Sequence, residues 1–168
     1  MFVKKATAAQ LDAAKNRLTV AFGETETVDN APVKEYMLKW LSAFAPDMTV
    51  YDAKSFCLPR LMYKNYLWHA FSFQKTDCYM DEDADEAFGE GFEGDCYVLL
   101  NDENLLCKSD GSAITLEKIK TFENIIIFTA DYAKTYVYTG KEGFGPYFKS
   151  ADMASAEGAE PIEPSEEE

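Results

Sequence analysis

The sequence predicts a single α+β domain, with two N-terminal helices packed on a largely antiparallel sheet that carries short inserted helices. The length of 168 residues fits one hydrophobic core, and hydrophobic residues make up 47% of the chain. Long stripes of apolar residues at helical spacing occur at residues 11–22 and 33–44. The apolar runs that follow are short, β-prone and separated by turn residues, which is typical of neighbouring antiparallel strands. We place the domain at residues 1–149.

Two amphipathic helices are expected near the N-terminus. Thr7 and Gln10 have the spacing of a capping box, and Gly23 is typical of a helix end. The apolar positions of the first helix recur every three or four residues: Leu11, Ala14, Leu18 and Phe22. Pro32 suits the first turn of a second helix, which Ala45-Pro46 closes. The apolar stripe of this helix consists of Val33, Met37, Trp40, Leu41 and Phe44. We expect the two helices to pack against each other as a pair.

From residue 66 on, the pattern predicts strands joined by turns and short helices. The run at 66–73 is nearly continuous in aromatic and apolar residues, which predicts a strand buried on both faces. Further strands are expected at 96–100, 105–107, 124–129 and 135–139, the first two as a hairpin. Short helices are expected at 81–88 and 115–122, a polar loop at 24–30 and a turn at 108–111.

The acidic residues are concentrated in two segments. The chain has 16 Lys and Arg against 30 Asp and Glu, for a formal net charge of −14. Residues 76–107 contain 11 acidic and no basic side chains, and residues 150–168 contain 7 acidic and none basic. Residues 150–168 also lack aromatics and include two prolines. We therefore expect 150–168 to be a disordered acidic tail that serves solubility, with mimicry of a polyanion as the alternative.

The charge excludes two classes of partner. Nucleic-acid binding depends on Lys and Arg contacts with phosphates, and anionic membranes attract basic segments, so neither is expected as a direct partner.

The sequence shows no signal-peptide pattern and no apolar run long enough for a transmembrane helix, which predicts a cytoplasmic protein. The cysteines are then expected to be reduced thiols, and their spacing lacks the Cys-x-x-Cys pattern of zinc or thioredoxin-like sites.

Two segments resemble a family of small bacterial proteins of unknown function. The segment Leu67-Trp68-His69-Ala70-Phe71-Ser72 is similar to that family's Leu-Trp-His-x-Phe-Ser strand. The segment 126–148, which ends in Gly145-Pro146-Tyr147-Phe148, is similar to the family's closing hairpin. Family members often read Trp-Thr-Phe-Val-x-Thr-His-Glu before that ending, whereas Lys134 replaces the Trp here and Gly140-Lys141 stands where the His falls. The resemblance covers roughly residues 60–148 and implies no particular activity. Some similar small acidic proteins act as immunity partners of toxins.

The candidate partner-binding site is a group of seven carboxylates: Asp81, Glu82, Asp83, Asp85, Glu86, Glu90 and Glu93. A segment this acidic suits a basic patch on another protein, because complementary charge speeds encounter and sets specificity. The run 81–86 also resembles the start of a calcium loop, but Glu86 stands where the loop needs Gly, and Phe92 where it needs Glu. Weak divalent-cation binding stays open as an alternative, and we assign no metal ligand.

A second candidate site is centred on His69, the only histidine. An acid–base role near neutral pH would fall to this side chain first. Tyr66, Trp68 and Tyr147 would line the same small-molecule or enzymatic site. On a strand, however, His69 shares a face with apolar residues, where a hydrogen-bonded core histidine is the simpler interpretation, and aromatics at strand spacing also fit cross-strand core pairs.

The sequence therefore favours a non-enzymatic interaction protein, immunity- or inhibitor-like, that recognises a basic partner. The glycine-rich stretches fit no phosphate-binding or dinucleotide-binding pattern, and no Gly-x-Ser-x-Gly segment is present. We accordingly expect no cofactor and assign no catalytic residue.

Overall fold

The computed structural model of the chain describes residues 7–23, 25–27, 33–46, 68, 71, 77–89, 91–103 and 105–151. In chain order its elements are α1 Ala8–Phe22, β1 Glu26–Thr27, α2 Val33–Phe44, β2 Tyr79–Met80, α5 Glu82–Phe88, β3 Asp95–Leu100, β4 Leu105–Asp110, the 3-10 helix Gly111–Ala113, α6 Leu116–Ile119, β5 Ile125–Thr129, β6 Lys134–Tyr138 and β7 Tyr147–Ser150. The predicted tail overlaps β7 at Ser150, and residues 152–168 of it lie outside the described residues.

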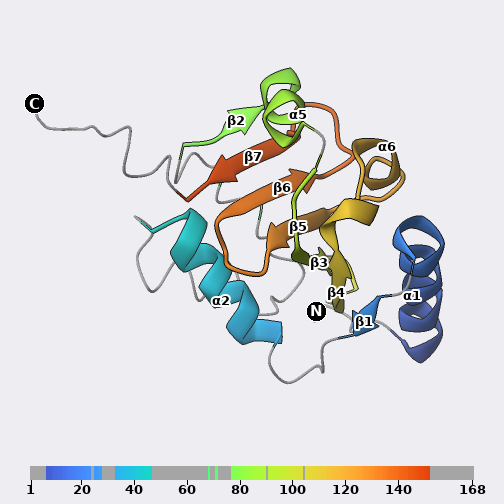
Figure 1. Ribbon diagram of the computed structural model, residues 1–168. Helices are drawn as coiled ribbons and strands as arrows, with labels where there is room; N and C mark the ends of the chain where they lie inside the picture. The colour runs from blue at the N-terminus through green and yellow to red at the C-terminus, as the bar shows by residue number, and fades with distance from the viewer. Residues whose placement is uncertain are drawn as a thin grey trace, which may run out of the picture.

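The strands form one sheet of seven in the order β1-β4-β3-β5-β6-β7-β2, and every neighbouring pair is antiparallel (Figure 1). The long strands β3 and β5 lie at its centre, where Val98 is paired with Cys107 on one side and Ile127 on the other. The two-residue strands β1 and β2 are its edges. The predicted α+β class and antiparallel sheet are confirmed.

The capping of α1 follows the sequence signals. The Gln10 backbone N–H donates to Thr7 Oγ1 at 3.1 Å, and the Thr7 N–H donates to Gln10 Oε1 at 2.8 Å. This reciprocal pair satisfies two amides that a helix start leaves without partners. The helix ends at Gly23, whose φ of 81° favours glycine. Both predicted ends of α1 are confirmed.

The prediction that the first two helices pack as a pair is wrong, because they cover opposite faces of the sheet (Figure 1). On one face α1 packs with α5 and α6, through residues such as Leu18, Phe88 and Ile119. On the other face α2 packs through Trp40, Leu41 and Phe44. The helices are separated because the sheet is apolar on both faces and each face needs to be covered.

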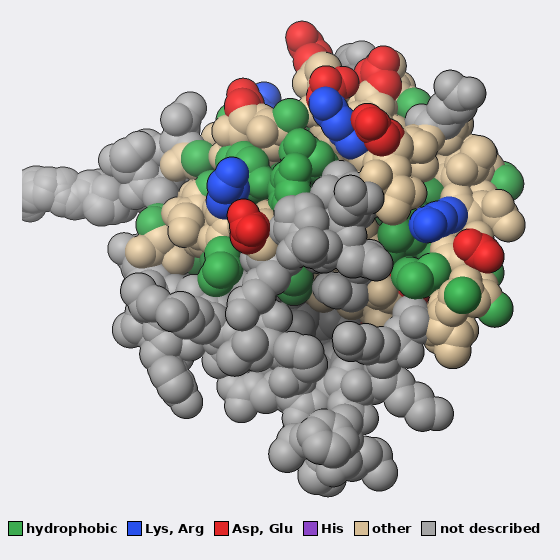
Figure 2. All heavy atoms as spheres, turned by 90° about the horizontal axis from the view of Figure 1, so that it is seen from below, with side chains coloured by type: hydrophobic (Ala, Val, Ile, Leu, Met, Phe, Trp, Pro, Cys, Tyr) green, Lys and Arg blue, Asp and Glu red, His purple; other side chains and the backbone are tan. Residues whose placement is uncertain are grey.

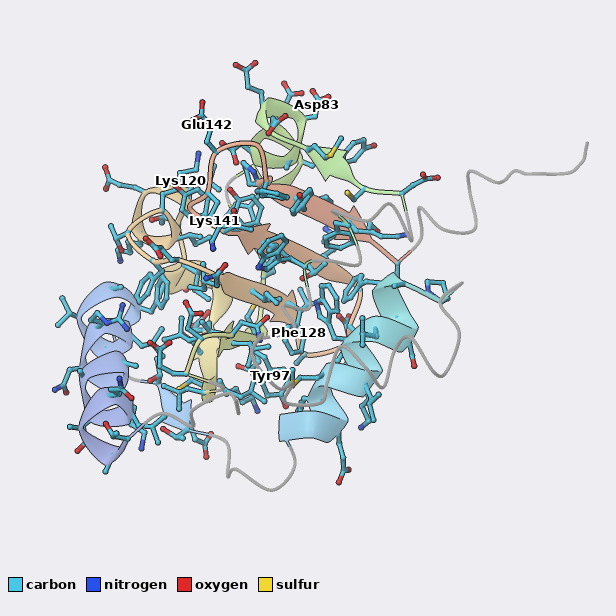
Figure 3. All side chains as sticks on the ribbon, turned by 180° about the vertical axis from the view of Figure 1, so that it is seen from behind. Asp83, Tyr97, Lys120, Phe128, Lys141 and Glu142 are labelled. Atoms are coloured by element: carbon cyan, nitrogen blue, oxygen red, sulfur yellow. The ribbon has the colours of Figure 1, made fainter. Side chains whose placement is uncertain are left out.

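Successive side chains of a strand point to opposite faces, and every residue of β5 is buried. The sheet is therefore apolar on both sides, so each face needs its own helix. Beneath α2, the rings of Tyr97 on β3 and Phe128 on β5 lie side by side, with centroids 5.4 Å apart (Figure 3).

The strand expected at 66–73 is not present at the two positions that the structure describes there. Trp68 lies in a turn and Phe71 is helical, with the Phe71 N–H donating to the Trp68 carbonyl at 2.9 Å. Both side chains are nonetheless buried in the α2 face of the core, and the Trp68 Nε1–H donates to Asn124 Oδ1 at 3.1 Å. A short apolar run identifies burial but not the type of element, which explains the error.

Two smaller differences concern loops. The turn expected at 108–111 begins at Gly111 instead, because β4 stays paired with β3 as far as Asp110. The polar loop at 24–30 contains β1, which is paired with β4 at Lys108 and Cys107. The helix expected at 115–122 is shorter than predicted, because α6, which Thr115 caps, ends at Ile119. No helix in the described ranges is long and apolar enough to cross a membrane.

Candidate functional site

Four acidic side chains lie exposed on α5 and the residue before it, and we call them the α5 acidic surface: Asp81, Glu82, Asp83 and Glu86. Asp81 turns the chain from β2 into α5 with a φ of 57°, and its N–H donates to the Pro146 carbonyl at 2.9 Å. Carboxylates in the first turn are favoured by the helix dipole. Figure 3 shows Asp83 pointing from α5 away from the sheet.

The opposite side of α5 fixes this orientation. Ala84 and Phe88 are buried in the core, and the Phe88 ring lies 4.8 Å from the Phe92 ring and 4.9 Å from the Tyr136 ring between centroids. Aromatic contacts at such distances stabilise packing beyond the area they bury. The helix is therefore amphipathic, and its acidic side faces outward because its apolar side is held by β6 and the loop after α5.

Asp85, also predicted to bind a partner, is turned toward the protein. Its Oδ1 accepts from the Tyr136 hydroxyl at 2.6 Å and its Oδ2 lies 2.5 Å from Lys120 Nζ, while its side chain is 26% exposed. Burial first, and then the hydrogen bond to this carboxylate, raise the pKa of Tyr136 above its ordinary value. Asp85 thus links α5 to β6 and to the end of α6.

Removing the Tyr136 hydroxyl tests that link. Tyr136→Phe should lower the free energy of unfolding by about 2 kcal/mol, because the partly buried Asp85 carboxylate loses a charge-assisted hydrogen bond from a buried hydroxyl. Chemical denaturation measures the change. Tyr138→Phe is the matched control, since the partly buried Tyr138 donates no hydrogen bond in the described part of the chain. Equal effects of the two substitutions would contradict the assigned role.

Glu93 lies in a different place from the α5 acidic surface. It lines a hollow of about 560 Å³ formed by residues 91–95 and the turn between β5 and β6, where Asp95, Asp131 and Lys134 also lie. Asp131 lies in this turn and accepts a hydrogen bond from the Thr129 hydroxyl at 2.7 Å, which lowers the pKa of its carboxyl group. Glu90 lies outside the described residues. The structure therefore does not bring the predicted carboxylates onto one surface.

The second candidate site has only two described members. Trp68 and Tyr147 are 2% and 3% exposed, so neither ring is open to a ligand from solvent. The Phe71 ring packs on Tyr147 with centroids 5.4 Å apart, and burial raises the pKa of Tyr147 to about 12. Tyr66 and His69 lie outside the described residues. The described part of this site is core packing.

The described cysteines are unactivated thiols. Burial raises the pKa of Cys78 to about 12 although the Lys149 ammonium acts in the opposite direction, and burial likewise raises the pKa of Cys96 to about 12. The pKa of Cys107 is also raised by burial. All three are free of disulfides. Because the thiolate is the nucleophile, these side chains are poorly suited to covalent chemistry at neutral pH.

The raised pKa values predict a loss of stability at alkaline pH. Ordinary values are 9.0 for cysteine and 10.0 for tyrosine, whereas in the fold Cys78, Cys96 and Tyr147 have pKa values of about 12. Above pH 9 the unfolded chain releases protons that the folded chain retains, so unfolding becomes more favourable. Thermal melting should be unchanged from pH 7 to 9 and decline toward pH 12. A melting temperature that stays constant to pH 12 would contradict these values.

Metal binding by the acidic residues finds no support in the geometry. Within the described ranges no three His, Cys, Asp or Glu side chains are grouped so that they could hold a metal ion. The carboxylates of the α5 acidic surface point outward from a helix, whereas a calcium loop wraps its oxygens around the ion.

Sequence reasoning missed the two apolar residues next to the acidic surface. Tyr79 and Met80 form β2 and are 45% and 52% exposed, which is high for large apolar side chains. The sequence does contain one indication of them, because this apolar pair interrupts an acidic stretch between Asp77 and Asp81. A two-residue strand has no periodicity that could identify it.

Comparison with known proteins adds the family. No curated protein and no solved structure matches the chain. A family described as a domain of unknown function, DUF4275, matches residues 27–148, which include every strand from β2 to β6 and the helices α2, α5 and α6. Because the match covers most of the chain, the protein belongs to the DUF4275 family.

Proposed function

We propose that this protein is a non-enzymatic interaction module, immunity- or inhibitor-like, whose α5 acidic surface binds a basic surface of another protein. One observation carries the proposal. The four exposed carboxylates stand together, and no ion pair in the described part of the chain involves any of them. The nearest acidic neighbour with a basic partner is Asp85, which is paired with Lys120.

The arrangement is costly to the isolated protein. Glu82 and Glu86 are four residues apart on one helix, where like charges repel by about 0.2–0.5 kcal/mol. A basic partner would turn this repulsion into attraction, mainly by raising the association rate. On the one face that Figure 2 draws, by contrast, the Lys and Arg side chains lie beside Asp and Glu. Such mixed charge gives little net attraction to either sign.

Neutralising the surface tests the proposal. The variant Asp81→Asn, Glu82→Gln, Asp83→Asn, Glu86→Gln removes four charges and leaves Asp85 in its internal contacts. Partner proteins are first captured from the source cell with the wild-type chain and then purified. Their association rate constants are measured by stopped flow at increasing salt. The variant should associate at least about tenfold more slowly at low salt, and its rates should depend less on salt.

A matched control removes the same charge from other parts of the domain. Asp12→Asn, Glu117→Gln, Glu123→Gln, Glu142→Gln changes four exposed carboxylates on α1, on α6 and in two loops. This control should associate like the wild type. If both variants slow association equally, the effect is one of net charge, and the proposed surface is wrong. If neither does, recognition of a basic partner is wrong.

A further inference from the structure

The edge strand β2 is built differently from the edge strand β1. Tyr79 and Met80 of β2 are large apolar side chains, 45% and 52% exposed, whereas β1 exposes Glu26 and Thr27. Proteins protect sheet edges with short strands and charges, and β1 fits that rule. The strand β2 is short but presents an aromatic ring and a thioether, which are side chains enriched in protein interfaces.

One side of the β2 backbone has no strand neighbour among the residues that the structure describes. In an antiparallel ladder, alternate residues direct their N–H and C=O groups toward opposite neighbours. The Asp81 N–H donates to the Pro146 carbonyl, and Tyr79 is paired with Phe148, so residues 79 and 81 face β7. The N–H and C=O of Met80 therefore face away from β7. Among the described residues, no strand lies beyond β2 in the sheet.

The side chains of β2 continue two rows of the sheet. The Tyr79 ring stacks on Phe148 with centroids 6.2 Å apart, on the face of α5. Met80 is paired with Tyr147, on the face of α2. A strand added along β2 would extend both rows, and its side chains would alternate between Tyr79 and Met80.

Charge decides what kind of strand fits. Asp77 precedes β2, and Asp81, Glu82 and Asp83 follow it, all exposed. A second copy of the chain pairing edge to edge would bring these carboxylates against their own copies, which repel. A segment carrying Lys or Arg beside apolar residues would place opposite charges there.

We propose that β2 is the anchor of the partner interface, where an extended segment of the partner with alternating basic and apolar residues adds as an eighth strand. The inference rests on the proposed function and names the partner's binding mode. The Met80 N–H and C=O would bond to the partner backbone, its apolar side chains would contact Tyr79 and Met80, and its basic residues would meet the α5 acidic surface.

The test uses a synthetic peptide of alternating lysine and valine, with a glutamate–valine peptide as the charge control. Hydrogen exchange followed by NMR on the full chain reports each amide. The Met80 amide should exchange fast in the free protein and slow down at least about fivefold when the lysine–valine peptide is bound. The Asp81 amide is already bonded to Pro146 and serves as the internal control.

Two variants separate the contribution of the Met80 backbone N–H to peptide binding from that of the Met80 side chain. Met80→Ala keeps the outward N–H, whereas Met80→Pro removes it, and proline is tolerated at a position whose N–H faces solvent on an edge strand. Met80→Pro should bind the lysine–valine peptide about fivefold more weakly than Met80→Ala, the loss expected for one backbone hydrogen bond. The exchange measurement on the wild type stands even if the proline variant does not fold.

The outcomes separate this inference from the proposed function. If the lysine–valine peptide binds but the Met80 amide is not slowed and the two variants bind alike, strand addition is wrong, while charge recognition by the α5 acidic surface stands. If the peptide binds no better than the glutamate–valine peptide, the proposed function fails together with the inference.

Discussion

Trp40→Ala is expected to lower the free energy of unfolding by about 4 kcal/mol, because it empties the largest fully buried site in the described core. The Trp40 ring is 0% exposed and lies 5.6 Å from Phe44 and 5.5 Å from Phe71 between centroids. Its Nε1–H donates to Thr135 Oγ1 at 2.9 Å. The substitution therefore removes the largest side chain that packs α2 on the sheet, together with the only described hydrogen bond from α2 to β6.

Trp40→Phe separates these two contributions. It keeps most of the ring volume and removes the donor, so Thr135 Oγ1 retains only the bond it donates to the Ile127 carbonyl at 2.8 Å. We expect a loss of about 1–2 kcal/mol for this variant. Equilibrium unfolding in urea measures both changes. A loss below about 1 kcal/mol for Trp40→Ala would contradict the position of α2 on this face.

Local signals in the sequence were sufficient for elements whose contacts are local. The capping box at Thr7 and Gln10 and the end of α1 at Gly23 involve neighbours within four residues. The hairpin of β3 and β4 joins two apolar runs through a short turn, so its pairing was also readable. The arrangement of the helices was not, because it depends on the sheet having two apolar faces.

At the candidate site, too, the sequence could predict only the features that depend on local contacts. The exposed residues of α5 follow from a helix whose Ala84 and Phe88 point inward, which the sequence pattern indicates. Asp85 faces inward because of Tyr136 and Lys120, which are 51 and 35 residues away in the chain. Glu93 shares a hollow with Asp131 from the β5–β6 turn. Contacts over such separations leave no periodic signal in the sequence.

Gly111→Ala is expected to lower the free energy of unfolding by about 3 kcal/mol, because a methyl group has no room at this position. An added Cβ would lie 2.4 Å from the Phe92 carbonyl oxygen and 2.9 Å from the Gly94 carbonyl oxygen. Both atoms belong to the backbone of the loop that joins α5 to β3. The Gly111 N–H also donates to the Gly94 carbonyl at 2.7 Å, so the two segments are held in close contact.

Gly143→Ala is the matched control, since an added Cβ there has no atom within 4 Å and only the φ of 85° opposes it. That cost is about 1–2 kcal/mol. Gly111 has no positive φ, so its whole loss, and not only an excess over Gly143, reports the steric clash. Because the loop pressed by Gly111 continues from α5, relief of the clash should displace Phe92 and loosen the Phe88 contact that orients the helix. Gly111→Ala should therefore also speed amide exchange in α5, whereas Gly143→Ala should not. Unchanged exchange in α5 on Gly111→Ala would show that this loop does not position the acidic surface.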